Sequence, residues 1–293
     1  METLPAALAA LPEVQAGAAF AGLVLLRLVE SAHAFFEQFR DRKARGKHLL
    51  RNLALGLLNT AVIALVFAGL WVWAAEWAAA RRVGLLHVLT DRAGLPGWAH
   101  VAGAVLLLDA WTYAWHRMNH RVPFLWRFHR VHHADAEMDV TTASRFHVGE
   151  LVLSSALRVP LIVLVGAYAW ELVLYETLMF AVVQFHHANV GLPAGLDRAL
   201  RAVIVTPNLH KVHHSRLQPE TDSNYSALFS WWDRLFRSFR LRERPHEIAF
   251  GLDEFMDPEH ETMAGLLKMP LGPVSPNPVR PPDPNDASSR SRS

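Results

Sequence analysis

The sequence predicts an all-α fold: an integral membrane helical bundle of about four to five membrane helices or hairpins, with a cytoplasmic histidine-rich helical cap. Hydrophobic residues make up 52% of the chain and recur in long runs, as is typical of membrane-embedded proteins. The histidines, 17 of the 293 residues, cluster at the ends of those runs. Ten tryptophans add aromatic residues suited to membrane boundaries.

Composition also excludes several classes of protein. The net charge is only +2, so no strong overall field favours nucleic acid as a partner. The chain has no cysteine, which excludes disulfides, thiolate catalysis, cysteine-ligated zinc and iron–sulfur clusters. Residues 270–293 are rich in Pro, Ser, Asp and Arg, and we expect this tail to be disordered because it lacks the apolar residues needed for a core.

Residues 1–97 are expected to supply N-terminal membrane helices and loops. The first span covers about 12–32 and lacks the basic start of a cleavable signal peptide. The strongly basic segment 40–51 is expected to be a cytoplasmic loop. The run 52–75 is long enough to cross the bilayer, and 76–97 would then be an outer loop.

A third span, 98–115, is expected to return the chain to the cytoplasm, where Pro123 would break the helix. Asp109 lies within this span, and an ionisable group inside a membrane is a functional candidate by default. We expect Asp109 to accept the free N–H of a metal-bound histidine and so orient its ring. The alternative is a polar contact between packed helices.

Residues 151–185 are apolar and are expected to form a helical hairpin, because a single crossing would separate the later histidines from the earlier ones. A lipid cavity is expected between this hairpin and the third span, lined for example by Trp111, Tyr113 and Phe180. The polar-aromatic segment 230–236 suits a helix lying in the membrane interface.

Eight histidines carry the main functional signal. The motif H-x-x-H-H occurs twice, where roughly 0.06 copies would be expected by chance. The spacings i, i+3 and i+4 bring histidines onto shared helix faces. Neutral imidazole binds Zn, Cu, Fe and Ni, and one such ion rarely takes more than four ligands in these sites, so eight rings predict two adjacent metals. The histidines are His116 and His120; His129, His132 and His133; and His210, His213 and His214.

The order of motifs over roughly residues 100–245 resembles the fatty acid hydroxylase/sterol desaturase superfamily. Seven elements occur in sequence: HR-x-x-H, H-x-x-H-H, R-F-H-x-x-E, F-x-H-A-N, T-P-x-x-H-x-x-H-H, N-Y and W-D-R-L-F. The resemblance implies a catalytic domain over 98–250 with two iron ions. Such an enzyme would use O₂ and two electrons to hydroxylate, or desaturate, a C–H position of a lipid.

Carried over residue by residue, the resemblance implies ten metal ligands and leaves His186 out. The ligands would be His116, His120, His129, His132, His133, His147, His187, His210, His213 and His214. Four further side chains are expected to support these ligands: Asp109, Glu150, Asn189 and Asp233. The chain departs from the family pattern at Ser226, where Gly is common, and at 237–239, which affects packing rather than ligands.

The expected partners are a lipid substrate, the membrane and a separate electron donor of the ferredoxin or cytochrome b5 type, since the sequence has no HPGG-type haem motif. The site would face the cytoplasm, in a bacterial inner membrane or the endoplasmic reticulum. Competing interpretations are a metal transporter or storage protein, a zinc hydrolase, and a scaffold with a degenerate site. The zinc hydrolase motif H-E-x-x-H is absent. The lipid and the position oxidised stay open.

Overall fold

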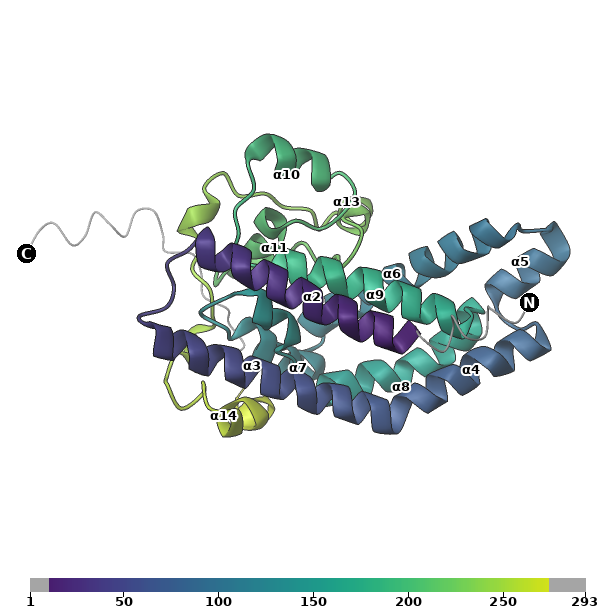
Figure 1. Cartoon of the computed structure of the whole chain (residues 1–293), viewed down its shortest axis with the longest axis horizontal. Coiled ribbons are helices and arrows are strands. Elements are labelled where there is room, and N and C mark those ends of the chain that lie inside the picture. The colour runs from purple at the N-terminus through teal and green to yellow at the C-terminus, as the bar shows by residue number, and fades with distance from the viewer. Residues whose placement is uncertain (1–10, 274–293) are drawn as a thin grey trace, which may run out of the picture.

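The computed structural model describes residues 11–273, and they fold into helices joined by turns and loops (Figure 1). The predicted all-α class is confirmed, with one isolated β-bridge between Ile204 and Phe229. The elements are α2 (Leu11–Ala32), α3 (Arg42–Val62), the π-helix η1 (Ile63–Phe67), α4 (Ala68–Arg81), α5 (Leu85–Ala93), α6 (Gly97–Arg121), α7 (Pro123–His133), η2 (Val140–Ser144), α8 (Val148–Val165), α9 (Ala169–His187), α10 (Ala194–Leu200), α11 (Pro207–His213), α12 (Gln218–Thr221), α13 (Trp231–Leu235), η3 (Pro245–Glu247), η4 (Asp253–Phe255), α14 (Met263–Lys268) and η5 (Met269–Leu271).

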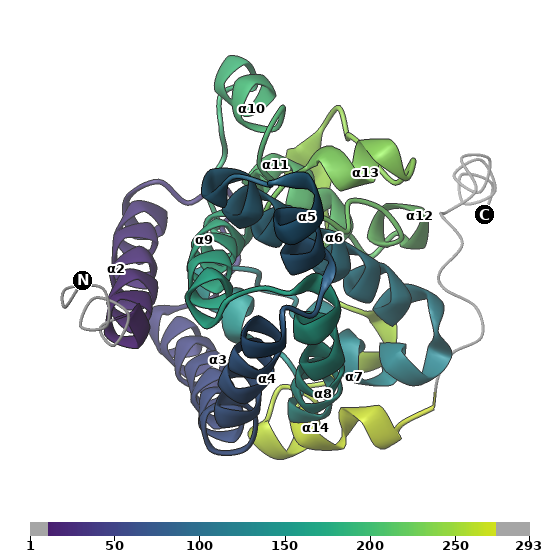
Figure 2. The same ribbon diagram turned by 90° about the vertical axis from the view of Figure 1, so that its right-hand side faces the viewer.

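The long helices run side by side along the molecule, and the short helices except α5 gather at one end as a cap (Figures 1 and 2). Among the described residues, three helical stretches are long and apolar enough to cross a membrane: Glu13–Ala32, Arg42–Ala93 and Val148–Val165. This is a membrane protein. The other two long helices, α6 and α9, are not among these stretches, and they contain buried acidic groups such as Asp109 and Glu171. The number of spans, four to five, therefore stays a prediction.

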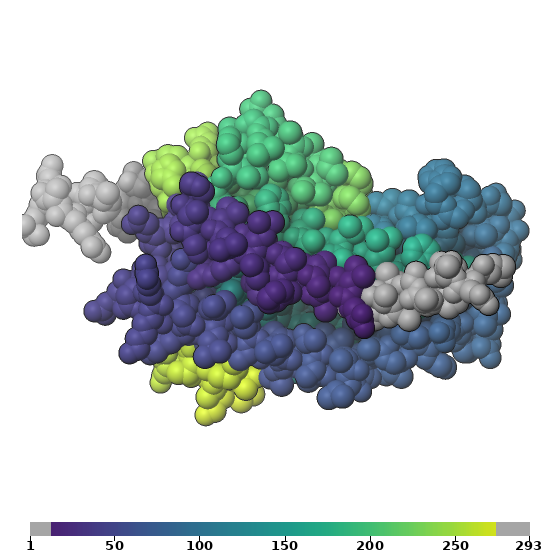
Figure 3. All heavy atoms as spheres, viewed as in Figure 1, coloured from purple at the N-terminus to yellow at the C-terminus, as the bar shows by residue number. Residues whose placement is uncertain are grey.

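The α3–η1–α4 rod is longer than predicted. Residues 42–51 are helical, so the basic loop expected at 40–51 was wrong beyond Asp41, which caps α3 by accepting from the Ala44 N–H. Lys and Arg are good helix formers, and contacts of His48 with Asp135 and of Asn52 with Thr141 hold this stretch of α3 in place. The rod spans about 60 Å, twice the hydrocarbon thickness, so its first half flanks the cap and its second half packs on α8. In Figure 3 the rod lies beneath α2 on the same face.

The expected outer loop at 76–97 is also largely helical, since α4 continues to Arg81 and α5 follows. The chain reverses between them at Gly84, whose φ of +109° favours glycine. A Cβ there would lie 2.4 Å from the Cα of Gly166, the left-handed residue that ends α8. Two turns therefore meet backbone to backbone at the end of the bundle opposite the cap.

The predicted hairpin is confirmed as α8 and α9, which reverse at residues 166–168. Its two arms separate, because α8 packs on α4 while α9 packs against α2 and α6. The main apolar core lies between these helices and uses small residues such as Ala74 and Ala104 for close approach. As predicted, Pro123 starts a new helix after α6 ends. A short helix, α13, is present in the segment 230–236, and its place in the membrane interface stays a prediction.

The C-terminal segment reaches back onto the cap. Arg127 donates to the carbonyls of Pro270 and Gly272, and Arg130 donates to those of Gly272 and Pro273. The predicted disordered tail was therefore wrong for 270–273, because these backbone contacts tie that segment to α7. The rest of the predicted tail, 274–293, lies outside the described residues.

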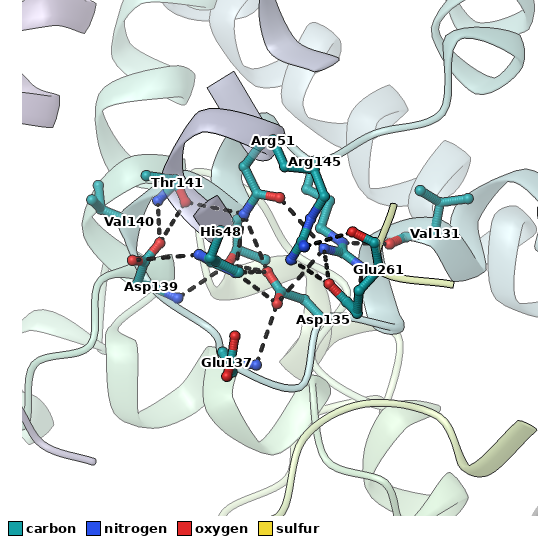
Figure 4. Close-up of polar contacts among 12 residues, drawn as sticks. His48, Arg51, Val131, Asp135, Glu137, Asp139, Val140, Thr141, Arg145 and Glu261 are labelled. Atoms are coloured by element: carbon teal, nitrogen blue, oxygen red, sulfur yellow. Dashed lines mark hydrogen bonds and ion pairs between the residues drawn. The ribbon is translucent and has the colours of Figure 1, made fainter. Parts of the chain in front are cut away.

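A buried polar network ties the first half of the rod to the loop that follows α7 (Figure 4). The imidazole Nε2 of His48 lies 2.9 Å from Asp135 Oδ1, and Arg145 donates to Glu261 at 3.0 Å. The guanidinium of Arg145 also lies 3.9 Å from Asp135. Burial alone would raise the pKa of Asp135, but the charges of His48 and Arg145 hold it well below its usual range. The network thus fixes a charged residue two positions after His133.

Replacing Arg145 with Met should strongly destabilise the protein, because Asp135 would keep a buried charge with less compensation. The expected cost is about 3–5 kcal/mol, the usual range for breaking a buried ion pair. The control is Arg244→Met, since Arg244 pairs with Glu247 at the surface and its side chain is 70% exposed. Thermal unfolding in detergent should show a clear fall in Tm only for Arg145→Met. Equal Tm values for the two variants would contradict the assignment of this network as a structural tie.

Candidate metal centre

Nine of the ten predicted ligands converge in the cap as two neighbouring sets. Within each set, one ring nitrogen of every member lies within 4.8 Å of the others. We call them site A and site B. Site A comprises His116, His120, His129, His133 and His213; site B comprises His132, His187, His210 and His214.

Two short helices, α7 and α11, each provide histidines to both sites, with the roles of the inner and outer motif positions exchanged. In α7 the outer pair of the H-x-x-H-H motif, His129 and His133, points to site A, and the inner His132 points to site B. In the second copy of the motif the outer pair joins site B, and the inner His213 joins site A. The copies therefore interlock, and the rings of His133 and His214 stack at a centroid distance of 4.5 Å. Proline at the first position starts each of these helices.

Helix ends bring the remaining ligands to the same place. His116 and His120 are one turn apart near the end of α6, and His187 is the last residue of α9. The N-cap Thr206 orients α11 by accepting from Leu209 N–H. Lys211 donates to the carbonyls of Ala188 and Val190, at 3.0 and 2.8 Å, and so ties α11 to the end of α9.

Hydrogen bonds fix the tautomers of three ligand rings. The Nδ1–H groups of His116, His213 and His187 donate to the carbonyls of Tyr225, Ser223 and Val183, at 2.7, 2.6 and 2.8 Å. Each neutral ring then has an unprotonated Nε2 with an exposed lone pair. This is the form in which a histidine binds a metal.

The Nε2 atoms of the ligand rings face one another. The Nε2 atoms of His213 and His116 are 3.0 Å apart in site A. In site B, the Nε2 of His187 lies 3.1 Å from the Nε2 atoms of His132 and of His210. The contact between His213 and His116 cannot be a hydrogen bond, since both Nδ1 atoms carry the proton. A metal–nitrogen bond of about 2.0–2.1 Å brings neighbouring ligand atoms to about 3 Å, so the spacing fits a shared cation.

Burial keeps the rings neutral. It lowers the pKa of His213 to about 3, although the bond to Ser223 opposes the shift. Burial likewise holds the pKa values of His133 and His214 well below the usual range, and neighbouring histidines lower them further. At pH 7 these ligands therefore need no deprotonation before they bind a metal.

Glu150 supports site A directly. Its Oε1 accepts from Nδ1 of His129 at 3.0 Å and from Nδ2 of Asn119 at 3.0 Å. A carboxylate in this position fixes the ring and increases its basicity toward a metal. Asp233 supports site A indirectly. Its carboxylate accepts from the N–H groups of Tyr225 and Ser226 and so holds the Tyr225 carbonyl, which accepts from Nδ1–H of His116.

Three predicted site residues, His147, Asn189 and Asp109, do not contact either set of histidines. His147 caps α8, where Nδ1 accepts from Gly149 N–H and Nε2 donates to the carbonyl of Leu267, so the structure does not bring it to either site. Asn189 bonds the backbone of Phe36 rather than a histidine.

The expectation that Asp109 orients a ligand was wrong. It accepts from the N–H groups of Leu228 and Phe229 and from the indole of Trp232. These partners lie more than a hundred residues away in sequence, so helical spacing could not reveal them. Sequence reasoning also missed the carbonyls of Ser223 and Tyr225, for which the N-Y motif was the available signal.

A cavity of about 320 Å³ opens beside the two sites. His116, His129, His132, His187 and His210 form part of its wall. Most of the remaining wall comes from the rod, α8 and α9. Phe180 lines the cavity as expected, but Trp111 and Tyr113 do not. The hydroxyl of Tyr113 is instead bonded to that of Ser238.

Replacing Glu150 with Gln should weaken metal binding about 10–100-fold, the usual effect of losing a group that orients a ligand. Glu171→Gln is the matched control, since Glu171 also accepts from a buried histidine, His100, but away from both sites. Iron(II) affinity is measured by chelator competition on purified, metal-stripped protein. Unchanged affinity in Glu150→Gln, or an equal loss in Glu171→Gln, would contradict the role of Glu150.

Part of the chain is similar to known proteins. Residues 101–238 match the fatty acid hydroxylase family. An ornithine lipid hydroxylase from Rhizobium tropici is 30% identical over 149 residues, which cover 50% of this chain and 44% of that protein. Human alkylglycerol monooxygenase is 29% identical over 51% of this chain and 32% of its own length. A cholesterol 25-hydroxylase-like protein from Danio rerio is 28% identical over 63% of this chain and 69% of its own length.

The chain thus spans less than half the length of the first two relatives. No solved structure is significantly similar to it. The matched segment contains all nine histidines of sites A and B, together with Glu150 and Asp233. On this match, residues 101–238 are similar to the fatty acid hydroxylase family.

Proposed function

We propose that the protein is a membrane-bound di-iron oxygenase that hydroxylates, or desaturates, a C–H position of a lipid. The observation that carries this proposal is the convergence of nine imidazoles, seven of them in buried residues, in two interlocked sets. An all-nitrogen site for two metals differs from the carboxylate-rich di-iron sites of soluble helical bundles. Bound iron would supply the O₂ chemistry that no side chain can perform.

The chain's own residues hold and isolate this chemistry. Sites A and B would each hold one iron ion, with Glu150 and the carbonyls of Ser223 and Tyr225 keeping the rings in the binding tautomer. The adjacent cavity would hold the lipid so that one C–H lies beside the metals. Because its wall is mostly apolar, the cavity excludes water from the reacting position.

The relatives support a lipid substrate, since their names specify ornithine lipid, alkylglycerol and cholesterol. The two electrons would come from a separate donor of the ferredoxin or cytochrome b5 type. The basic start of α3, with Arg42, Lys43 and Lys47, flanks the cap and suits the cytoplasmic side of a multi-pass protein. The metal sites would then face the cytoplasm.

Protein purified from iron-supplemented cells should contain close to two iron ions per chain. His132→Ala and His213→Ala remove one ligand from site B and site A respectively, and each should lose iron, because a buried site missing a ligand binds more weakly. His147→Ala is the control and should keep its iron, since its ring lies in neither set. Metal content is measured by mass spectrometry, beside lipid analysis of expressing cells for an oxidised product.

One iron or none in the unsubstituted protein would overturn the di-iron assignment. Loss of iron in His147→Ala to the same extent would show that iron content reports folding rather than ligation. Two irons without any oxidised lipid would favour a metal-storage function instead.

A further inference from the structure

The cavity beside the metal sites contains an ion pair far from the histidines. Arg158 of α8 and Glu176 of α9 form a salt bridge, and both side chains line the cavity. Trp71 lies against the guanidinium, whose carbon is 5.1 Å from the ring centroid. The pair and its aromatic neighbour thus come from three helices, α4, α8 and α9. The cavity lies between α8 and α9, and the salt bridge joins these two helices across it.

The pair lies deep in the apolar part of the bundle. Glu176 precedes His187, a ligand of site B, by eleven residues of the same helix. At 1.5 Å per residue, that separation is about 16 Å. That is about half the hydrocarbon thickness of a bilayer. The cavity thus has metal ligands at one end and charged groups about 16 Å away.

Stability does not account for an ion pair at this depth. Replacing a buried ion pair with apolar residues is often neutral or stabilising, and ionisable groups within membrane helices usually have a function. One hydrogen-bond donor of the pair is also unpaired, because Arg158 Nε is buried and has no hydrogen-bond partner within the described residues. The side chains of Arg158 and Glu176 remain 12% and 23% exposed.

The charge of the pair selects the kind of group it can bind. Arg158 and Glu176 neutralise each other, so a charged lipid group would introduce an uncompensated charge at mid-membrane depth. A hydroxyl group introduces none. It can donate to the Glu176 carboxylate and accept from the Arg158 guanidinium at the same time.

We propose that Arg158 and Glu176 form a subsite for an uncharged hydroxyl group of the lipid substrate, about 16 Å from the C–H that is oxidised. This inference rests on the proposed function and names its substrate class: a lipid whose hydroxyl anchors it while the far end of its chain reaches the metal sites. The subsite would determine which carbon is presented to the metals.

Photo-crosslinking tests the subsite without requiring turnover. The full chain in lipid nanodiscs is labelled with three sixteen-carbon probes that carry a diazirine near one end and a hydroxyl, a methyl or a carboxylate at the other. Peptide mapping should find the alcohol on cavity residues near the histidines, such as Phe146 or Val183, about tenfold more than the methyl probe, as expected for the loss of hydrogen bonds. Iron content is measured on the same samples.

Two double variants separate recognition from folding. Arg158→Leu with Glu176→Leu should abolish the preference for the alcohol while iron content is kept. Arg158→Glu with Glu176→Arg restores a neutral pair and should retain most of the preference. Equal labelling by the alcohol and methyl probes, or strongest labelling by the carboxylate, would overturn the proposal. The alcohol preference in protein that binds no iron would support the subsite and count against the proposed function instead.

Discussion

The constraint on which the rest of the structure depends is the mutual approach of unprotonated imidazole nitrogens. The Nε2 lone pairs of His116 and His213 meet at 3.0 Å in site A and repel each other unless a cation lies between them. The protein nevertheless builds this arrangement and fixes it through carbonyl acceptors on the opposite ring nitrogens. Holding the ligands in this arrangement therefore lowers the stability of the metal-free fold, and bound metal would raise that stability again.

The supports of the site come from distant parts of the chain. The Asp135–Arg145 network ties α7 to the rod and to the C-terminal segment. Asp109 and Asp233 hold the segment after α12, which supplies the carbonyl for His116. Both aspartates act by accepting backbone N–H groups, which is an effective way to fix an irregular segment beside a rigid helix. The metal centre is thus supported by helices of the membrane part as well as by the cap.

Much of the site could be predicted from the sequence because its information is local. Helical spacing grouped the histidines, and their number predicted two metals. Spacing could not assign rings to sites, because i+3 and i+4 partners share a face within a helix, whereas the division between site A and site B depends on how α7 and α11 face each other. His147 lies in a motif between the ligand histidines, so sequence alone could not separate it from them. The structure shows that its ring nitrogens are bonded to Gly149 and Leu267 instead. The helix at 42–51 was missed because charge suggested a loop, whereas contacts of His48 and Asn52 with residues almost ninety positions away keep it folded.

The central claim is that two separate metal positions lie within the interlocked histidines. It is tested most directly by anomalous diffraction at the iron absorption edge from crystals of the iron-loaded protein. The account predicts two peaks, one enclosed by His116, His129 and His213 and the other by His132, His187 and His210. A single peak shared by all nine rings, or peaks outside both sets, would contradict it.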